Sequence, residues 1–149
     1  MAQHSSTRWM QTYRHIFGNR PISEPCIPES HDAGTSRLGC HTIFGTESNV
    51  LTQTKSIFDQ LELGVRRLEI RPTLTADTLA CGHYTGEAEK KIGWQRGSCL
   101  EIKEVVDDLN HFTKDNAELV IVDITHFQRI IIDDPISSTR MAKAAGCSN

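Results

Sequence analysis

An amphipathic stretch followed by a β-branched apolar run is the feature that most constrains the fold. Ser98 and Glu101 have the spacing of a capping box, and an apolar stripe at helical intervals follows them. Residues 119–124 then predict a strand buried on both faces, as in a parallel sheet. A helix that leads into such a strand indicates an α/β fold. The stripe consists of Ile102, Val105, Val106, Leu109 and Phe112.

Two earlier segments continue this alternation. Residues 22–27 form a short apolar-rich run that stops at Pro28, and they predict a strand that leads into a polar loop. Residues 54–63 have apolar side chains near helical spacing and predict a helix, for which Gly64 supplies the stop. A second strand is therefore expected directly after Gly64.

Residues 65–71 predict that strand. Leu68 and Ile70 are expected to face the helical layer, while Glu69 and Arg71 point to the opposite side. A weaker extended run at 78–82 leads into His83 and then into a glycine-containing loop that holds Trp94. Two charged side chains aimed into a sheet interior require a functional or structural reason.

Composition narrows the class of protein. The 149 residues carry a formal net charge of -3 and no long Lys/Arg block, which argues against nucleic acid as a partner. No run of about 18 apolar residues and no secretory signal pattern is present, so we expect a cytoplasmic or peripheral membrane protein. We divide the chain into an amino-terminal extension (1–20), a central region (21–134) that holds the candidate catalytic residues described below, and a loosely ordered tail (135–149).

The cysteines give a further expectation about the compartment. Their number is odd, and no Cys-x-x-Cys pair suggests a zinc site or thiol exchange. We interpret them as buried or free thiols of a reducing compartment. They are Cys26, Cys40, Cys81, Cys99 and Cys147.

Four residues at or just beyond predicted strand ends could carry chemistry: His31, Glu69, Arg71 and His83. Two histidines suit phosphodiester chemistry, because one can take a proton from the attacking hydroxyl while the other protonates the leaving oxygen. An arginine between them can bind phosphate oxygens, and an acidic neighbour can orient a histidine.

Each of these residues also has a structural interpretation. A single histidine after a strand is commonly a loop residue, and Glu69 and Arg71 could simply pair with each other. His126, near the end of the last strand, could line the opening of the same site and bind substrate, or it could be a structural histidine.

Several segments, in the correct order, resemble the X region of phosphatidylinositol-specific phospholipases C. Ile27-Pro-Glu-Ser-His-Asp-Ala-Gly-Thr35 is similar to that family's Ile-Pro-Gly-Thr-His-Asp-Ser-Gly-Thr motif. Residues 54–71 resemble its Gln-Leu…Gly-Ile-Arg…Leu-Asp-Ile-Arg segment, and Gly82-His83 falls where the second histidine is expected. Residues 119–127 resemble its Val-Ile-Leu-Asp-Phe-x-His-Phe strand. The resemblance covers roughly residues 20 to 127.

The resemblance implies a distorted TIM-type barrel whose active site lies at the carboxyl ends of the strands. His31 would be the general base on the inositol 2-hydroxyl, and His83 the general acid to the departing diacylglycerol. Arg71 would stabilise the phosphate, while Asp32 and Glu69 would support the histidines and the nucleophile. The products would be a cyclic inositol phosphate and diacylglycerol. Because an arginine occupies the region where calcium sits in the animal enzymes, no metal cofactor is expected.

Three departures from the family pattern matter. Glu29-Ser30 replaces Gly-Thr. Glu69 stands where aspartate is commoner, so its carboxylate lies one methylene farther from the backbone. A complete barrel of this type needs about 250 residues, whereas this chain supplies about four strands, the first half of the barrel. The missing half is also the usual source of the acidic partner of the first histidine. We therefore expect self-association, or pairing with a second half-barrel chain, to cover the open edge.

Two other functions stay open. The first is a glycerophosphodiester or sphingomyelin-type phosphodiesterase, in which Glu69 and nearby acids hold calcium or magnesium. The second is a non-catalytic, truncated relative that binds phosphoinositides or related phospholipids at a membrane surface without turnover.

Overall fold

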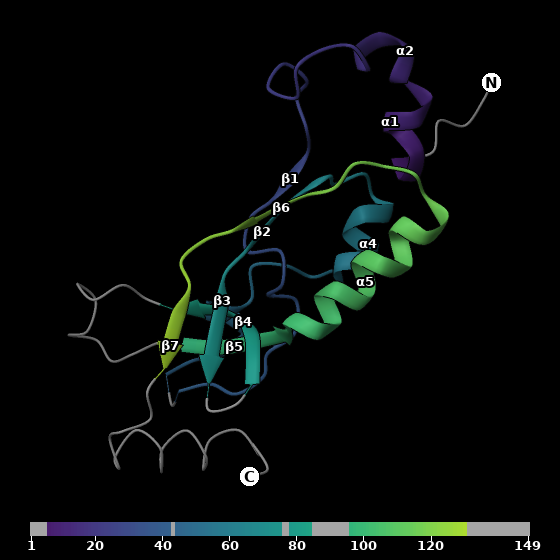
Figure 1. The fold of residues 1–149 in the computed structure, drawn as a ribbon. Coiled ribbons are helices and arrows are strands. Elements are labelled where there is room, and N and C mark those ends of the chain that lie inside the picture. Colours follow the sequence, from purple (N-terminus) through teal and green to yellow (C-terminus); the bar gives the residue numbers. More distant parts are fainter. Residues whose placement is uncertain (1–5, 43, 76–77, 85–95, 131–149) are drawn as a thin grey trace.

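The computed structural model describes residues 6–42, 44–75, 78–84 and 96–130. The predicted tail at 135–149 and the loop that holds Trp94 lie outside these ranges. The elements run in the order η1 (Ser6–Arg8), α1 (Trp9–Thr12), α2 (Arg14–Phe17), β1 (Glu29–Ser30), α3 (Glu47–Val50), α4 (Ile57–Glu62), β2 (Arg67–Ile70), β3 (Pro72–Thr75), β4 (Thr78–Tyr84), β5 (Arg96–Glu101), α5 (Ile102–Asp115), β6 (Ile121–Ile124) and β7 (Gln128–Ile130) (Figure 1).

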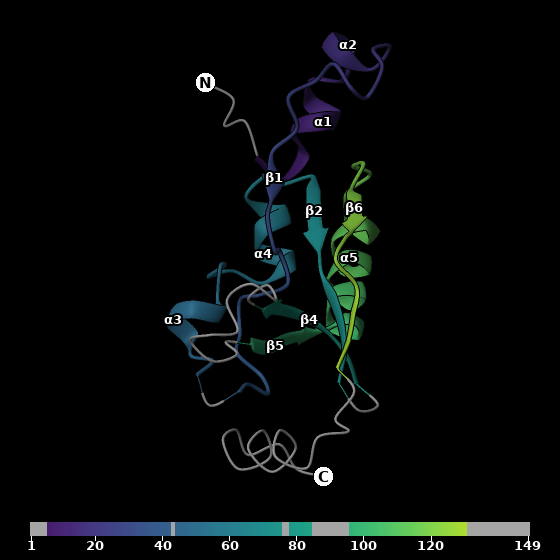
Figure 2. The ribbon, with the colours of Figure 1, turned by 90° about the vertical axis from the view of Figure 1, so that its left-hand side faces the viewer.

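The strands are divided between two sheets. β1, β2 and β6 form a parallel sheet in the order β1-β2-β6, and the second sheet has the order β5-β4-β3-β7. β3 follows β2 after a single residue, Arg71, and pairs in parallel with β7. Both views place α1 and α2 at the opposite end of the structure from β4 and β5 (Figures 1 and 2).

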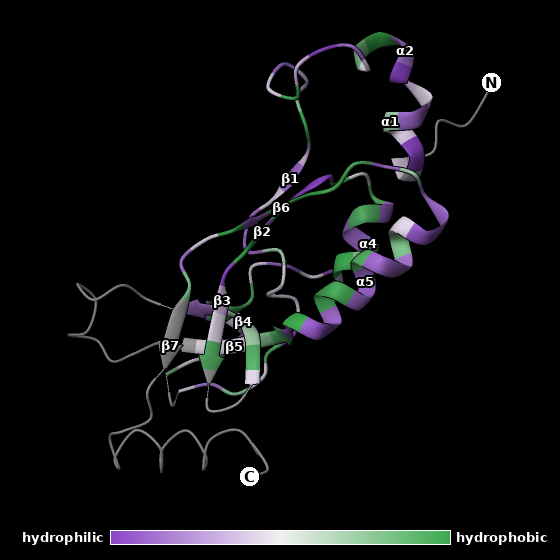
Figure 3. Ribbon diagram, viewed as in Figure 1, coloured by the Kyte–Doolittle hydropathy of each residue, from purple (hydrophilic) through white to green (hydrophobic). Residues whose placement is uncertain are grey.

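The core lies between the parallel sheet and the pair α4 and α5. Leu68 and Ile70 of β2 are buried in one cluster with Ile57, Leu61 and Phe112 of the two helices. Both helices carry apolar and polar residues, in keeping with one buried and one exposed face (Figure 3). The predicted alternation in β2 is thus confirmed, and it leaves Glu69 and Arg71 on the face away from the helices.

The predicted strand at 22–27 is wrong. Residues 21–28 form turns and irregular backbone, and β1 begins only at Glu29. Pro25 and Pro28 have no N–H to donate to a strand ladder, which explains why pairing starts after the second proline.

The predicted start of the long helix is also wrong, by three residues. Ser98 belongs to β5, where its N–H donates to the carbonyl of Cys40 over 2.8 Å. Glu101 caps α5 instead, in a capping box with Glu104. Within the apolar stripe Val105 and Phe112 are buried, whereas Val106 is 46% exposed.

β6 is not buried on both faces as predicted. Val122 is 39% exposed and Ile124 is 69% exposed, although both lie on the sheet face that packs against α4 and α5 elsewhere. β6 pairs only with β2 and is therefore an edge strand in the described part of the chain. The β-branched side chains of β6 suit a strand that neighbouring elements cover, as in a complete barrel. No described element covers this edge of the sheet.

A buried ion pair ties the amino-terminal segment to the base of the parallel sheet. Nε of Arg66 donates to Glu118 over 2.9 Å, and both side chains are fully buried. The backbone N–H groups of Met10 and Gln11 donate to the same carboxylate. The indole N–H of Trp9 donates to the carbonyl of Gly64 over 2.8 Å. These contacts fix residues 6–12 against the strand ends opposite the predicted site.

The cysteines differ in part from the prediction. Cys81 and Cys99 are buried thiols and Cys26 is an exposed one, but Cys40 is disulfide-bonded. Spacing along the sequence does not show which cysteines meet in space, so this bond could not be predicted. None of the helices in the described ranges combines the length and apolar character needed to cross a bilayer.

Candidate active site

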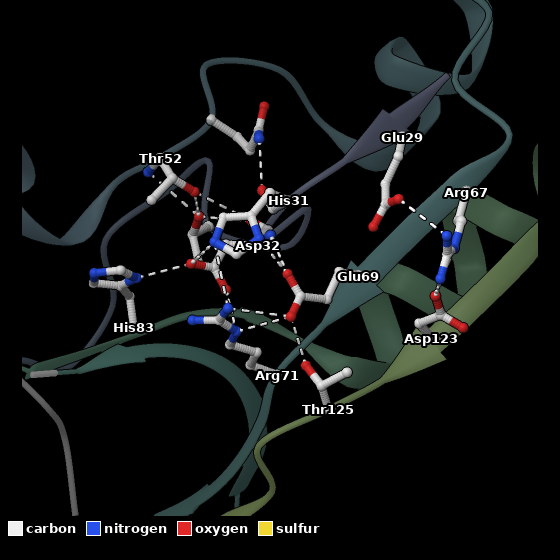
Figure 4. A network of polar contacts seen from close by, with 12 residues as sticks. Glu29, His31, Asp32, Thr52, Arg67, Glu69, Arg71, His83, Asp123 and Thr125 are labelled. Atoms are coloured by element: carbon white, nitrogen blue, oxygen red, sulfur yellow. Dashed lines mark hydrogen bonds and ion pairs between the residues drawn. The ribbon is translucent and has the colours of Figure 1, made fainter. Parts of the chain in front are cut away.

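Five predicted site residues meet at the carboxyl ends of β1 and β2 (Figure 4). Because these two strands are parallel, their carboxyl ends lie at one edge of the sheet. The residues after β1 supply two side chains, β2 and its end supply two, and β4 brings in one. The five are His31, Asp32, Glu69, Arg71 and His83.

The loop after β1 holds a strained backbone. Asp32 has φ +48°, a left-handed conformation that aspartate tolerates better than most residues. The carbonyl of Asp32 accepts a hydrogen bond from Thr35 Oγ1 over 2.7 Å, and Gln53 Nε2 donates to the carbonyl of His31 over 2.7 Å. A Cβ on Gly34 would lie 2.1 Å from Sγ of Cys81, so this loop packs too closely for any side chain there.

His83 is oriented by Asp32. Its Nδ1 lies 2.9 Å from Asp32 Oδ2, and the Asp32 side chain is fully buried. An ionised carboxylate can only accept, so Nδ1 of His83 carries the proton of this bond. Nε2 of the same ring is left for another partner.

His31 meets the second carboxylate. Its Nδ1 lies 2.5 Å from Glu69 Oε2, while the ring itself is 65% exposed. Burial raises the pKa of Glu69, but hydrogen bonds from Thr125, Arg71 and the backbone N–H of Asp32 outweigh burial and lower that pKa to about 2. Glu69 is therefore ionised over the whole range in which a histidine titrates.

Arg71 lies between the two carboxylates. Its Nε is 2.9 Å from Asp32 Oδ1, but the N–H of this nitrogen is directed at Glu69 Oε1, 3.1 Å away. Asp32 Oδ1 therefore accepts no hydrogen bond despite its burial. Nη2 of Arg71 lies 3.3 Å from Nε2 of His31. Because a guanidinium can only donate, this contact places a lone pair on Nε2 of His31.

Three side chains that could bind a cation also gather here. One atom each from His31, Asp32 and Glu69 can be chosen so that all lie within 4.8 Å of one another. The Arg71 guanidinium already pairs with both carboxylates, and a divalent ion between them would have to displace it or lie beside its positive charge. The two carboxylates suit calcium or magnesium, but the imidazole of His31 is a poor ligand for either ion, and the position of Arg71 opposes both.

His126 is not joined to this cluster by any contact within the described ranges. It has φ +50°, its side chain is exposed, and its carbonyl accepts a hydrogen bond from the hydroxyl of Tyr84. The register between β2–β3 and β6–β7 shifts by one residue around this position, which is typical of a β-bulge.

Thr125 is a site residue that the sequence interpretation missed. Its Oγ1 donates to Glu69 Oε1 over 2.7 Å. The signal was the strand alternation: Asp123 is in register with Glu69, so the residue two positions later lies on the same face. On that face Arg67 also forms ion pairs with Asp123, at 2.5 Å, and with Glu29, at 3.3 Å (Figure 4).

No family model matches the sequence, and no curated protein matches it significantly. Solved structures of phosphatidylinositol-specific phospholipase C from Staphylococcus aureus do match in fold. A point mutant of that enzyme has a TM-score of 0.62 and 21% identity, over 85% of this chain and 38% of that one. A structure concerned with modulation of the enzyme's membrane binding has a TM-score of 0.60 and 20% identity, over 85% and 38%. A second point mutant has a TM-score of 0.55 and 17% identity, over 97% and 45%.

The chain spans less than half the length of the structures that it matches. The described strands and helices fit a part of their barrel, with β6 and β7 at the open edge. The chain therefore has the fold of a phosphatidylinositol-specific phospholipase C, as a partial TIM barrel.

Proposed function

We propose that this chain carries the acid–base site of a phosphoric diester hydrolase or lyase that cleaves phosphatidylinositol-type lipids. The observation that carries the proposal is that each of two histidines bonds to a different carboxylate, with an arginine between the carboxylates. Similarity in fold to phosphatidylinositol-specific phospholipase C supports the same reaction class. The products are a cyclic inositol phosphate and diacylglycerol.

His31 acts as the general base in this proposal. The lone pair on its Nε2 takes the proton of the inositol 2-hydroxyl as that oxygen forms a bond to phosphorus. The bond between Nδ1 and Glu69 supports this role, because it holds the tautomer in which Nε2 is free to accept.

His83 acts as the general acid. As the bond between phosphorus and the diacylglycerol oxygen breaks, its Nε2 gives a proton to the departing oxygen. Asp32 fixes the ring through Nδ1 and stabilises its charged form. Arg71, which lies between the histidine partners, contacts the phosphate oxygens, and His126 remains a proposed substrate contact at the mouth of the site.

No metal enters this proposal, and the position of Arg71 is the reason. The runner-up function is a phosphodiesterase that depends on calcium or magnesium, and the grouping of His31, Asp32 and Glu69 supports it. Turnover that disappears in chelator and returns with the ion would favour this runner-up.

The proposed partner is a phosphoinositide or related phospholipid at a membrane surface. Exposed apolar residues along the open edge also support association with a second copy or a second half-barrel chain. Sedimentation of the purified chain would distinguish a monomer from a dimer. The residues of this edge are Leu119, Val122, Ile124 and Phe127.

Substitution of the histidines tests the function. We expect His31→Ala and His83→Ala each to lower the rate of cyclic inositol phosphate release by about 10²- to 10⁴-fold. His15→Ala is the matched control, because His15 is exposed on α2, away from the site. Equal turnover in all three variants would remove both histidines from the mechanism. Lipid binding without product in the wild type would leave the non-catalytic, lipid-binding function.

A further inference from the structure

The two carboxylate oxygens of Glu69 have different partners. Oε1 accepts hydrogen bonds from Thr125 Oγ1 at 2.7 Å and from Nε and Nη2 of Arg71 at 3.1 Å each. Oε2 lies 2.5 Å from Nδ1 of His31 and accepts a longer bond, of 3.4 Å, from the backbone N–H of Asp32. The donors on Oε1 therefore leave Oε2 directed at the histidine.

Asp32 is not placed to orient His31. Its Oδ2 bonds to Nδ1 of His83 at 2.9 Å, and its Oδ1 lies 2.9 Å from Nε of Arg71. Its approach to His31 is 3.5 Å and is made to Nε2, the nitrogen that faces Arg71. Among the described residues, only Glu69 contacts Nδ1 of His31.

We infer that Glu69, held by Thr125, is the positioning residue for His31, so that this chain supplies a separate carboxylate for each histidine of the site. The inference rests on the proposed function, because it assigns the residue that prepares the general base. It also removes the need for an acidic group from the rest of a barrel to orient His31.

The length of the side chain is what makes this possible. Glu69 is anchored on β2 beside Arg71, and its outer oxygen reaches back to the loop after β1. An aspartate at this position would withdraw the carboxylate by about 1.5 Å, the length of one C–C bond. The contact of 2.5 Å with His31 would then open beyond hydrogen-bond distance.

Thr125 is fixed by the parallel sheet. Its N–H donates to the carbonyl of Ile70 over 3.0 Å, and its hydroxyl points along the barrel-interior face to Glu69. This hydroxyl also contributes to the low pKa of the Glu69 carboxyl. Valine has the same shape as threonine but cannot donate, so Thr125→Val removes this hydrogen bond with little change in packing.

The test is NMR on the full chain, with labelled histidine rings and labelled glutamate carboxyls. In the wild type we expect the neutral His31 ring to carry its proton on Nδ1. Glu69→Asp should shift this proton toward Nε2. Thr125→Val should raise the pKa of Glu69 above its wild-type value of about 2, because one of the hydrogen bonds that lower it is lost, and Thr125→Ser should restore it. The matched control is Thr73→Val, at a buried threonine whose hydroxyl has no hydrogen-bond partner.

An unchanged His31 tautomer in Glu69→Asp, or an unchanged pKa of Glu69 in Thr125→Val, would overturn the inference. Thr125→Ala serves if Thr125→Val does not fold. These signals do not depend on turnover, so they separate this inference from the proposed function. A wild type that is inert toward phosphatidylinositol but holds the Nδ1 proton on His31 would refute only the proposed function. With turnover present, kcat should fall in Glu69→Asp while KM stays nearly constant.

Discussion

Nδ1 of His83 lies 2.9 Å from Oδ2 of Asp32, although the two residues are 51 positions apart in the sequence. The parallel pairing of β1 with β2 and the turn of the chain through β3 into β4 bring them together. In this position Asp32 has a left-handed backbone and a fully buried carboxylate, both of which are energetically unfavourable. The bond fixes the histidine ring relative to the loop after β1.

Asp32→Asn should therefore lower turnover without unfolding the chain. Asparagine also tolerates φ +48°, but it lacks the charge that stabilises protonated His83. We expect the initial rate of cyclic inositol phosphate release to fall by about 10²- to 10⁴-fold. Asp59→Asn, at an exposed position of α4, should leave the rate unchanged. Equal rates for the two variants would contradict the role given to Asp32.

Much of the site could be predicted from the sequence because its residues follow strand ends. His31, Asp32, Glu69 and Arg71 belong to β1, β2 and the residues next to them, and parallel strands collect their carboxyl ends at one edge. His126 follows the last predicted strand as well, yet it lies beyond β6 with φ +50°, where the register shifts by one residue. His126 was predicted as a site residue because it follows the strand in the sequence. The register of β6 with β2 instead places Thr125 at the site.

Other features depend on contacts that a sequence pattern does not record. Two adjacent arginines, Arg66 and Arg67, look alike in the sequence, but one is fully buried and the other is half-exposed. The β-branched run at 119–124 reports the hydrophobicity of a strand and not whether a neighbour covers it. The start of α5 shifted because Ser98 bonds to Cys40, a residue far away in the sequence.

The arginine pair gives a matched test of stability. Arg66→Met leaves the buried carboxylate of Glu118 without its cation and should cost about 3–5 kcal/mol in the free energy of unfolding. Arg67→Met removes partly exposed ion pairs and should cost at most about 1 kcal/mol. Urea denaturation of the two variants measures the difference. Equal midpoints would contradict the anchoring role of Arg66.

Gly34→Ala should destabilise the loop that carries the site. The new methyl group would lie 2.1 Å from Sγ and 2.7 Å from Cβ of Cys81, so the loop or β4 must move. We expect a cost of about 1–3 kcal/mol in urea denaturation. The double variant Gly34→Ala/Cys81→Gly removes the clash. Its loss of unfolding free energy should therefore be smaller than the sum of the losses in the two single variants. Simple additivity would show that the two residues are not in contact.

The low pKa of Glu69 predicts how stability depends on acid. Its folded-state pKa, about 2, lies below the ordinary value of 4.5, so its ionised form stabilises the folded chain above about pH 4.5. That contribution is lost progressively as the pH falls toward about 2. Between about pH 6 and pH 3 the wild type should therefore lose more unfolding free energy than Glu69→Gln. An identical loss would show that Glu69 gains nothing from its partners, and exposed Glu24→Gln is the control.

The central claim is that two histidines, each held by its own carboxylate, cleave a phosphatidylinositol-type lipid without a metal. Phosphorus NMR of the purified chain with phosphatidylinositol micelles, in chelator and again with added calcium, tests it most directly. We predict a cyclic inositol phosphate signal in chelator that calcium does not increase. Silence in both samples, or a signal only with calcium, would contradict the claim.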